Sequence, residues 1–554
     1  MARRTVTWHG DADVSSPAGP RGVAHGRLLL LVAAVTSVVL VLAARSQIYD
    51  TNFYLLGEAT SILAGDHPYR DFFEWGAPLA AYLSAAMQVV VGYRLIGEFL
   101  TQWLFIVAGV VISFHLGLRL SRSIAASLAV LPVVVVLIAY TPTYHYSKLF
   151  FFPATVWLAW RYLDRPGPFR SAVFGATTAV AFLFRHDYGV YIGFAAVVAF
   201  VLARAAVPAT RRVTSVLADG GAYAAAVALV LAPWMAAVQM NEGLVSYVGL
   251  RIVQYERPSD RFVYEALFRL DPFGALTSWL RAPASAGAAD NGAVWLREMA
   301  LLVPIFLLSS AALELWRSRR RAEAVPSDAW RMALAGAFLV VVASALYREP
   351  AYVVVAAPLT AALAARYLVG RGWVQRGCAI GLLLLAGMAA VVWTRDSPIF
   401  RPSEMPHAVS EAFVRLLASP PMPAESSGSP SPLLQYLRDC TAPGDRLLVT
   451  GSTPFQVNYY ARRPIAGGHL FWRQRWRSDP VHEQQSLRLL LRQSVPFAFS
   501  TNDPVLDDFK AYPTIREYLV ENYVELEGSR GRLLVDTRRQ PTGTFGSTGF
   551  PCFR

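Results

Sequence analysis

Long apolar stretches alternate with short polar loops along the first two thirds of the sequence. An apolar helix of about 17–25 residues can cross a hydrocarbon core roughly 30 Å thick. The pattern predicts membrane spans at 27–44, 95–118, 124–141, 148–163, 170–184, 188–206, 215–238, 298–316, 331–346, 350–368 and 376–394. A further apolar stretch, 78–93, is short and begins with Pro78, so we expect a helix that lies on or dips into the membrane surface.

The loops between these spans are of two kinds. One kind is rich in arginine, around residues 119–122, 161–170, 204–212, 317–331 and 366–376. The other kind carries aromatic, histidine and acidic residues. The two kinds alternate if 78–93 does not cross the membrane, and arginine-rich loops face the cytoplasm. We therefore predict eleven spans, a disordered cytoplasmic leader at 1–26 and an extracytoplasmic C-terminal part.

The sequence after residue 394 has a different pattern. Residues 395–432 read as a helix followed by a linker, "SPPMPAESSGSPSP". Strand-like "RLLVTG", "PFAFS" and "GRLLVDT" then alternate with helix-like "PFQVNYYARR", "EQQSLRLLLRQ" and "IREYLVENY". This alternation predicts a small α/β domain over 433–554. It has no glycine-rich phosphate loop, so we assign it no catalysis.

Composition supports a membrane protein. The 554 residues are 55% hydrophobic and 16% charged, and the net charge is +13, whereas soluble proteins are about a quarter charged. The arginines sit in short loops, where they set orientation, so we expect no nucleic-acid partner. Cys378, Cys440 and Cys552 have no metal-binding spacing. A disulfide between Cys440 and Cys552 is an alternative for an extracytoplasmic tail, but we expect two unpaired thiols.

Ionisable residues crowd one outer segment, 45–94, which follows the first span. They are interleaved with aromatic side chains and comprise Asp50, Glu58, Asp66, His67, Arg70, Asp71 and Glu74. A solvated loop is one interpretation. However, the outer loops "YTPTYHYSK", "RHDYG" and "YREPAY" repeat this chemistry. Because the predicted topology places all of them on one face, we expect them to converge in an outward cavity, as in an active site.

Such a cavity suits sugar transfer from a lipid phosphate. A carboxylate can take a proton from an acceptor, or hold a divalent metal. Arginine and lysine can bind a phosphate leaving group. An outer surface has no supply of nucleotide sugars, so the donor has to be carried by a lipid.

The stretch "YDTNFYLLGEATSILAGDHPYRDFFEWGAPLAAYL" has a distinctive order: an acid, a glycine about fifteen residues on, "PYRD", and a Pro-Leu pair among aromatic residues. It resembles the outer first loop of GT-C glycosyltransferases of the bacterial protein-mannosyltransferase-like and aminoarabinose-transferase-like type. "GYRLIGEFLTQWLF" resembles the part that follows that loop. The likeness covers residues 27–210, and the remainder matches by layout alone.

The resemblance implies an all-α polytopic fold with a transmembrane catalytic module over 27–394 and a C-terminal extracytoplasmic α/β domain. It implies inverting transfer of a sugar from a polyprenyl-phosphate donor to a lipid, glycan or protein acceptor at the outer face of the bacterial inner membrane. Its catalytic candidates are Asp50 as the base, with Asp71 and Glu74. Candidates near the donor phosphate are Arg70, His145, Lys148, Arg185, Asp187 and Arg348.

The second outer loop departs from the family because it has no Asp or Glu. No cofactor is therefore assigned, and a divalent metal held by Asp50 and Asp187 stays open. Two other functions stay open as well. One is a transporter or flippase for lipid-linked sugars, and the other is a non-catalytic envelope-assembly protein.

Overall fold

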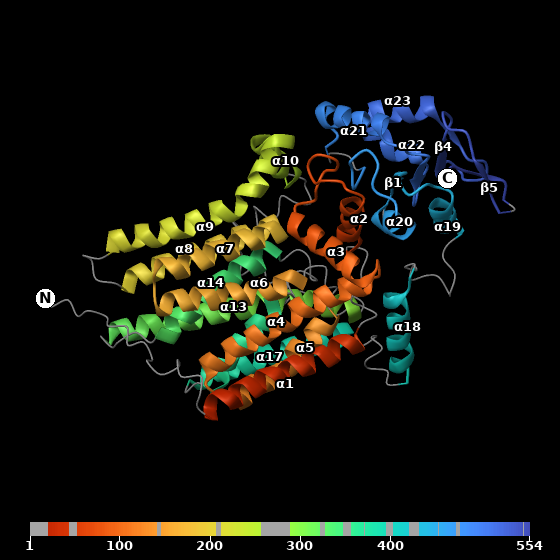
Figure 1. Ribbon diagram of the computed structural model, residues 1–554. Coiled ribbons are helices and arrows are strands. Elements are labelled where there is room, and N and C mark those ends of the chain that lie inside the picture. Colours follow the sequence, from red (N-terminus) through yellow and green to blue (C-terminus); the bar gives the residue numbers. More distant parts are fainter. Residues whose placement is uncertain are drawn as a thin grey trace. The chain divides into compact units, whose positions relative to one another are not determined.

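The computed structural model describes residues 20–43, 52–140, 146–206, 212–255, 288–321, 327–346, 356–369, 372–394, 403–419, 432–451, 454–472, 477–546 and 548–554 (Figure 1). The chain divides into two compact units. The helical unit comprises Met1–Gln47, Gln102–Ala232 and Arg261–Ser410. The mixed unit comprises Ile48–Thr101, Pro233–Asp260 and Glu411–Arg554, so it combines the ionisable outer segment with the C-terminal part.

Every predicted span coincides with a helix. These helices are α1 (Pro20–Leu42), α4 (Ile96–Ser121), α5 (Ile124–Tyr140), α6 (Tyr146–Asp164), α7 (Pro168–Phe184), α8 (His186–Ala206), α9 (Arg212–Asn241), α13 (Ala288–Arg320), α14 (Ser327–Leu346), α16 (Ala357–Val369) and α17 (Trp373–Thr394). The first helix begins at Pro20, within the predicted leader. The unit boundary falls inside α4 and α9.

Six of the helices in the described ranges are both long and apolar enough to cross a membrane. They are His25–Leu42, Ile96–Ser121, His186–Arg204, Leu217–Asn241, Leu301–Arg320 and Ser327–Ala345. Large apolar side chains on them are exposed, among them Leu30, Val197 and Leu229, as expected of surfaces that face lipid. The chain is therefore a multi-pass membrane protein. Crossing by the other five predicted spans stays a prediction.

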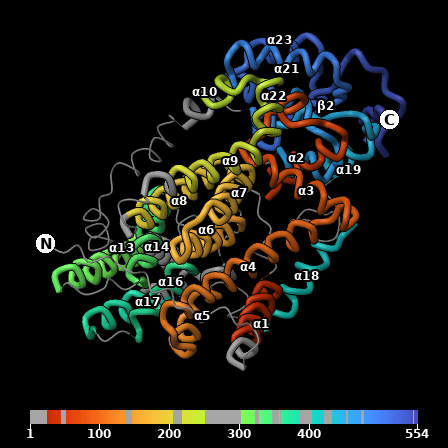
Figure 2. Tube along the Cα trace, turned by 60° about the vertical axis from the view of Figure 1, so that its left-hand side comes forward, coloured from red at the N-terminus to blue at the C-terminus, as the bar shows by residue number. Residues whose placement is uncertain are grey.

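Small residues allow the helices of the helical unit to approach closely. A Cβ atom at Gly109 on α4 would collide with the carbonyl of Leu149 on α6, and one at Gly117 with the carbonyl of Ala362 on α16. Lipid gives helices no hydrophobic reason to associate, so such close backbone packing has to hold them together. Helices α6, α7 and α8 lie side by side in both views (Figures 1 and 2).

The C-terminal part of the mixed unit contains a four-stranded sheet. Its order is β1 (Leu447–Thr450), β2 (Phe497–Ser500), β4 (Leu533–Asp536) and β3 (Tyr523–Glu525). Strands β1 and β2 are parallel, and the other pairs are antiparallel. The helices are α19 (Pro432–Asp439), α20 (Pro454–Ala461), α21 (Pro480–Arg492), α22 (Val505–Asp508) and α23 (Pro513–Asn522), with a 3-10 turn, Phe509–Ala511.

The three predicted strands and three predicted helices of this α/β part are confirmed. Alternation along the strands gives the sheet two apolar faces, because Leu448 and Ala498 join one buried cluster while Val449 and Phe499 join another. Strand β3, helix α19 and a hairpin of β5 (Gly543–Phe545) and β6 (Phe550–Cys552) were not predicted.

The rest of the mixed unit is helical. It contains α2 (Asn52–Leu63), α3 (Pro78–Val91), α10 (Leu244–Tyr255) and the last part of α18 (Met405–Leu417). Helix α3 covers most of the stretch predicted not to cross the membrane. Its 14 residues are about 21 Å long, too short to span a bilayer.

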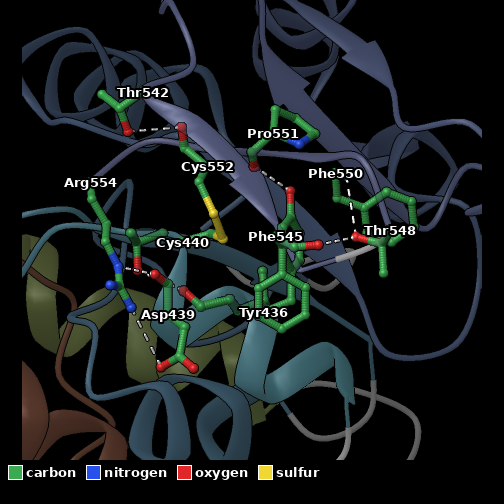
Figure 3. The surroundings of a disulfide bond; sticks show 12 residues. Tyr436, Asp439, Cys440, Thr542, Phe545, Thr548, Phe550, Pro551, Cys552 and Arg554 are labelled. Carbon is green, nitrogen blue, oxygen red and sulfur yellow. Dashed lines mark hydrogen bonds and ion pairs between the residues drawn. A yellow bond between two sulfur atoms is a disulfide. The ribbon is translucent and has the colours of Figure 1, made fainter.

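A disulfide joins Cys440 to Cys552, so the expectation of two unpaired thiols is wrong (Figure 3). The two Cα atoms are 4.3 Å apart although 112 positions separate them in sequence. The backbone N–H of Phe553 donates to the carbonyl of Cys440 at 2.9 Å, and the Tyr436 hydroxyl donates to the carbonyl of Pro551 at 2.8 Å. These contacts place β6 beside the end of α19, which the spacing of cysteines could not reveal.

Candidate functional site

The predicted site residues fall into three groups. Asp50, His145 and Arg348 lie outside the described residues. Arg70, Asp71 and Glu74 belong to the mixed unit, and Lys148, Arg185 and Asp187 belong to the helical unit. The last two groups are therefore described separately.

Asp71 is held by its own loop. The Arg70 guanidinium donates to its carboxylate at 2.7 Å, and the backbone N–H of His67 donates at 2.8 Å. Burial alone would raise the pKa of Asp71, but these hydrogen bonds outweigh it and lower the pKa below its usual value. The "PYRD" element is thus a self-contained charged turn.

Glu74 is fully buried and organises the next turn. One carboxylate oxygen accepts hydrogen bonds from the backbone N–H groups of Gly76 and Ala77. The other accepts from the hydroxyls of Tyr69, at 3.3 Å, and Tyr247, at 3.1 Å. These contacts are those of a structural carboxylate, since a buried charge needs several donors to offset its lost hydration. Catalysis by Glu74 stays a prediction.

The remaining described acids of this segment also make structural contacts. Asp66 forms an ion pair with Arg446, whose Nη1 lies 2.7 Å from the carboxylate. Glu58 accepts a hydrogen bond from the backbone N–H of Trp75 at 3.0 Å. The N–H of Phe73 donates to the carbonyl of Gly468 at 2.8 Å. The segment is therefore fastened to the α/β part of the mixed unit.

The other group forms a compact arrangement that we call the cation cluster: Lys148, Arg185 and Asp187. Arg185 Nε lies 2.9 Å from one carboxylate oxygen of Asp187, and Lys148 Nζ lies 4.0 Å from the other. These contacts bring two of the outer loops together, and convergence of all the outer loops in one cavity stays a prediction. Two basic side chains thus share one carboxylate.

Helix ends position the three side chains. Lys148 lies in the first turn of α6, and its side chain is completely buried. Arg185 follows the last residue of α7 in an extended conformation. Asp187 occupies the first turn of α8, where the helix dipole stabilises a negative charge. The break between α7 and α8 therefore places a cation and an anion side by side.

Aromatic and hydroxyl groups complete the surroundings of Lys148. Its Nζ lies 5.5 Å from the centre of the Tyr188 ring, within the range of a cation–π interaction. The Tyr188 hydroxyl hydrogen-bonds the Ser147 hydroxyl at 3.0 Å. The sequence interpretation did not select these two residues, although both lie in the loops it quoted.

The opposite end of α6 carries a second charged network. Asp164, its last residue, accepts hydrogen bonds from Arg119 and Arg331. Arg331 also pairs with Asp328 at 2.7 Å. These contacts bring three arginine-rich loops together, and their cytoplasmic location stays a prediction. Lys148 and Asp164 are 16 positions apart on one helix, about 24 Å, so the cation cluster and this arginine-rich network lie at opposite ends of α6.

The cation cluster does not fit a divalent metal. Within the described ranges, no group of three or more His, Cys, Asp or Glu side chains could hold a metal ion. Asp187 is flanked by two positive side chains, which would repel a dication. We therefore route no chemical step through a metal.

No protein-family model matches the sequence, and no curated protein is significantly similar to it. The function is therefore inferred from the chemistry of the chain itself.

Two ion pairs were not predicted from the sequence: Asp66–Arg446 and the buried Glu242–Arg477 at 3.0 Å. Each pair joins segments that are distant in sequence. Such contacts carry no periodic signal.

Proposed function

We propose that the protein is an integral membrane glycosyltransferase of the GT-C type. It transfers a sugar from a polyprenyl-phosphate donor to a cell-envelope acceptor at the extracytoplasmic face. The cation cluster is the observation that carries this proposal, because two basic side chains that meet at the end of an apolar helix suit the phosphate of a lipid. The polyprenyl-phosphate donor is inferred from the resemblance of residues 27–210 to GT-C glycosyltransferases.

In the proposed reaction, the bond between the sugar's anomeric carbon and the phosphate oxygen breaks. The electron pair leaves with the phosphate, and Arg185 and Lys148 stabilise the charge that develops there. An acceptor oxygen or nitrogen attacks from the opposite side, which inverts the anomeric centre. Asp50 takes the acceptor's proton, and Asp187 lies beside Arg185 as its counter-ion.

The proposed orientation rests on two features. The arginine-rich network belongs on the cytoplasmic side, which assigns the cation cluster to the outer side. Disulfides form in oxidising compartments, so the Cys440–Cys552 bond favours an extracytoplasmic C-terminal part. Together they support an extracytoplasmic C-terminal part. The bacterial inner membrane, the cytoplasmic N-terminus and about eleven spans complete the proposal.

A deletion strain tests this function. We expect its envelope to lack one glycan or glycolipid modification while the corresponding polyprenyl-phosphate sugar accumulates, as mass spectrometry of extracted lipids would show. The wild-type gene and Asp503→Asn, a change at an exposed acid, should restore the modification. Asp50→Asn should insert normally and fail to restore it. Full restoration by Asp50→Asn would remove Asp50 as the base, and an unchanged envelope would remove the proposed function.

A further inference from the structure

Helix α3 exposes two valines and buries a serine and a glutamine, unlike a typical helix at the surface of a soluble protein. Its polar side chains, Ser84 and Gln88, are buried. The Ser84 hydroxyl donates to Glu98, and Gln88 accepts a hydrogen bond from the Tyr459 hydroxyl at 3.3 Å. Outward, Val89 and Val90 are 69% and 77% exposed. Because water would penalise this exposure, the outer face of α3 is built to contact acyl chains.

A stack of side chains closes the end of this helix. The Tyr93 ring stacks on Tyr459 at 4.9 Å, and the Arg462 guanidinium lies over Tyr93 at 4.7 Å from its centre. The Tyr93 hydroxyl hydrogen-bonds the Thr60 hydroxyl at 2.8 Å and donates to the Tyr459 carbonyl at 3.1 Å. Burial raises the pKa of Tyr93 to about 12, so the phenol stays neutral. The Arg462 guanidinium thus packs on the stacked rings of Tyr93 and Tyr459.

Backbone conformation marks the same place. Tyr93 has φ +60° and Arg462 has φ +53°, in the left-handed region that costs a residue with a side chain roughly 1 kcal/mol or more. Each residue follows the end of a helix, α3 or α20. Because both conformations are unfavourable, the surrounding fold must hold Tyr93 and Arg462 in these positions.

Arg94 adds a second guanidinium two positions before α4 begins at Ile96. Its Nε atom is buried without a hydrogen-bond partner in the described part of the chain. Neither Arg94 nor Arg462 forms an ion pair with a described carboxylate. Leu100, one turn into α4, is exposed. Among the described residues, Arg94 therefore lies between the exposed valines of α3 and the exposed Leu100 of α4 without a carboxylate partner.

We propose that this arrangement is a binding site for an anionic phospholipid of the bilayer. Arg462 and Arg94 hold the headgroup phosphate, and an acyl chain lies along Val89 and Val90 of α3. The charge of the two guanidiniums complements a lipid phosphate, and arginine can grip its oxygens in pairs. The site is independent of the proposed sugar transfer, because it requires a membrane and no donor.

Native mass spectrometry of the full-length protein in detergent tests the site. Dioleoyl phosphatidylglycerol is titrated against dioleoyl phosphatidylcholine, and the bound lipids are counted. We expect wild type to retain phosphatidylglycerol preferentially. Arg462→Glu should weaken its retention by about tenfold, since each basic residue near an anionic lipid contributes about fivefold. Arg492→Glu makes the same charge change at an exposed residue of α21 and should leave retention unchanged.

The alternatives are separated by further arms of this experiment. If Arg462→Glu folds poorly, Arg462→Gln and Arg94→Gln should each weaken retention by about threefold to fivefold. Equal retention of the two lipids, or an equal loss in Arg492→Glu, would overturn the site. Stoichiometric displacement of phosphatidylglycerol by a polyprenyl phosphate would overturn it as well, because the position would then belong to the donor. Full competition by inorganic phosphate alone would show that α3 does not contribute to lipid binding, and this result would also contradict the proposed site.

Discussion

The ionisable outer segment of the mixed unit and the cation cluster of the helical unit use charge in opposite ways. In the segment, each described carboxylate accepts a hydrogen bond from a nearby donor: Glu58 and Glu74 from backbone N–H groups, Asp66 from Arg446 and Asp71 from Arg70. In the cluster, one carboxylate serves two cations. The charges of the outer segment thus hold its own turns together, whereas the cluster brings two basic side chains to a single carboxylate.

This difference separates effects on folding from effects on activity. Removing a carboxylate from the segment leaves buried donors without acceptors, which destabilises the fold. Removing a cation from the cluster lowers its affinity for an anion and leaves a carboxylate that can still be hydrated or protonated. Substitutions in the outer segment should therefore lower the stability of the fold, whereas substitutions in the cation cluster should lower activity.

The largest effect is expected at Arg185. Arg185→Gln should reduce kcat/KM for transfer from a polyprenyl-phosphate sugar by about 100-fold, the usual loss when one donor to a developing negative charge is removed. The matched control is Arg122→Gln, since Arg122 is 70% exposed in the arginine-rich network; it should stay within about threefold of wild type. Equal losses in the two variants would remove the assignment of the cation cluster.

Glu74→Gln should mainly affect stability. The amide can no longer accept all the hydrogen bonds from Gly76, Ala77, Tyr69 and Tyr247, and we expect a loss of about 2 kcal/mol. Thermal unfolding of the purified protein should shift downward by about 2 °C. Activity per folded molecule should stay within about threefold. A large loss of activity at an unchanged melting temperature would instead place Glu74 in catalysis.

The Asp66–Arg446 ion pair should show a smaller coupling. Both side chains are largely buried, so a double-mutant cycle of Asp66→Asn and Arg446→Gln should give about 1–2 kcal/mol of interaction free energy. The exposed pair Asp507–Lys510 serves as the reference and should give at most about 0.5 kcal/mol. Equal coupling in both cycles would mean that Asp66 does not fasten the segment.

The smallest effect is expected at Asp71, and it depends on pH. The folded-state pKa of Asp71 is lowered, so its contribution to stability is present above the unfolded value of about 3.9 and is lost as pH falls through the folded value. Asp71→Asn should therefore be less stable than wild type at pH 6. The difference should shrink as the pH is lowered below about 4. A difference that grows at acidic pH would contradict the hydrogen-bonded turn.

Features that depend on local sequence were predictable. Apolar runs located helices, six of them long and apolar enough to cross a membrane, and short strand-like stretches located β1, β2 and β4. The meeting of Lys148 with Asp187 followed from topology alone, because loops on one face of a helical bundle are neighbours. Asp66–Arg446 and Cys440–Cys552 were not predictable, since long-range contacts leave no trace in spacing. The structural use of Glu74 depends on a turn geometry that no sequence motif specifies.

Phosphate binding by the cation cluster is the central claim, and the affinity of the full-length protein for a polyprenyl phosphate tests it most directly. Two substitutions change the charge of the cluster in opposite directions: Arg185→Gln removes a cation, and Asp187→Asn removes the carboxylate. We predict that the first weakens binding at least tenfold and that the second does not weaken it. Equal weakening by both, or binding that neither substitution alters, would contradict the account.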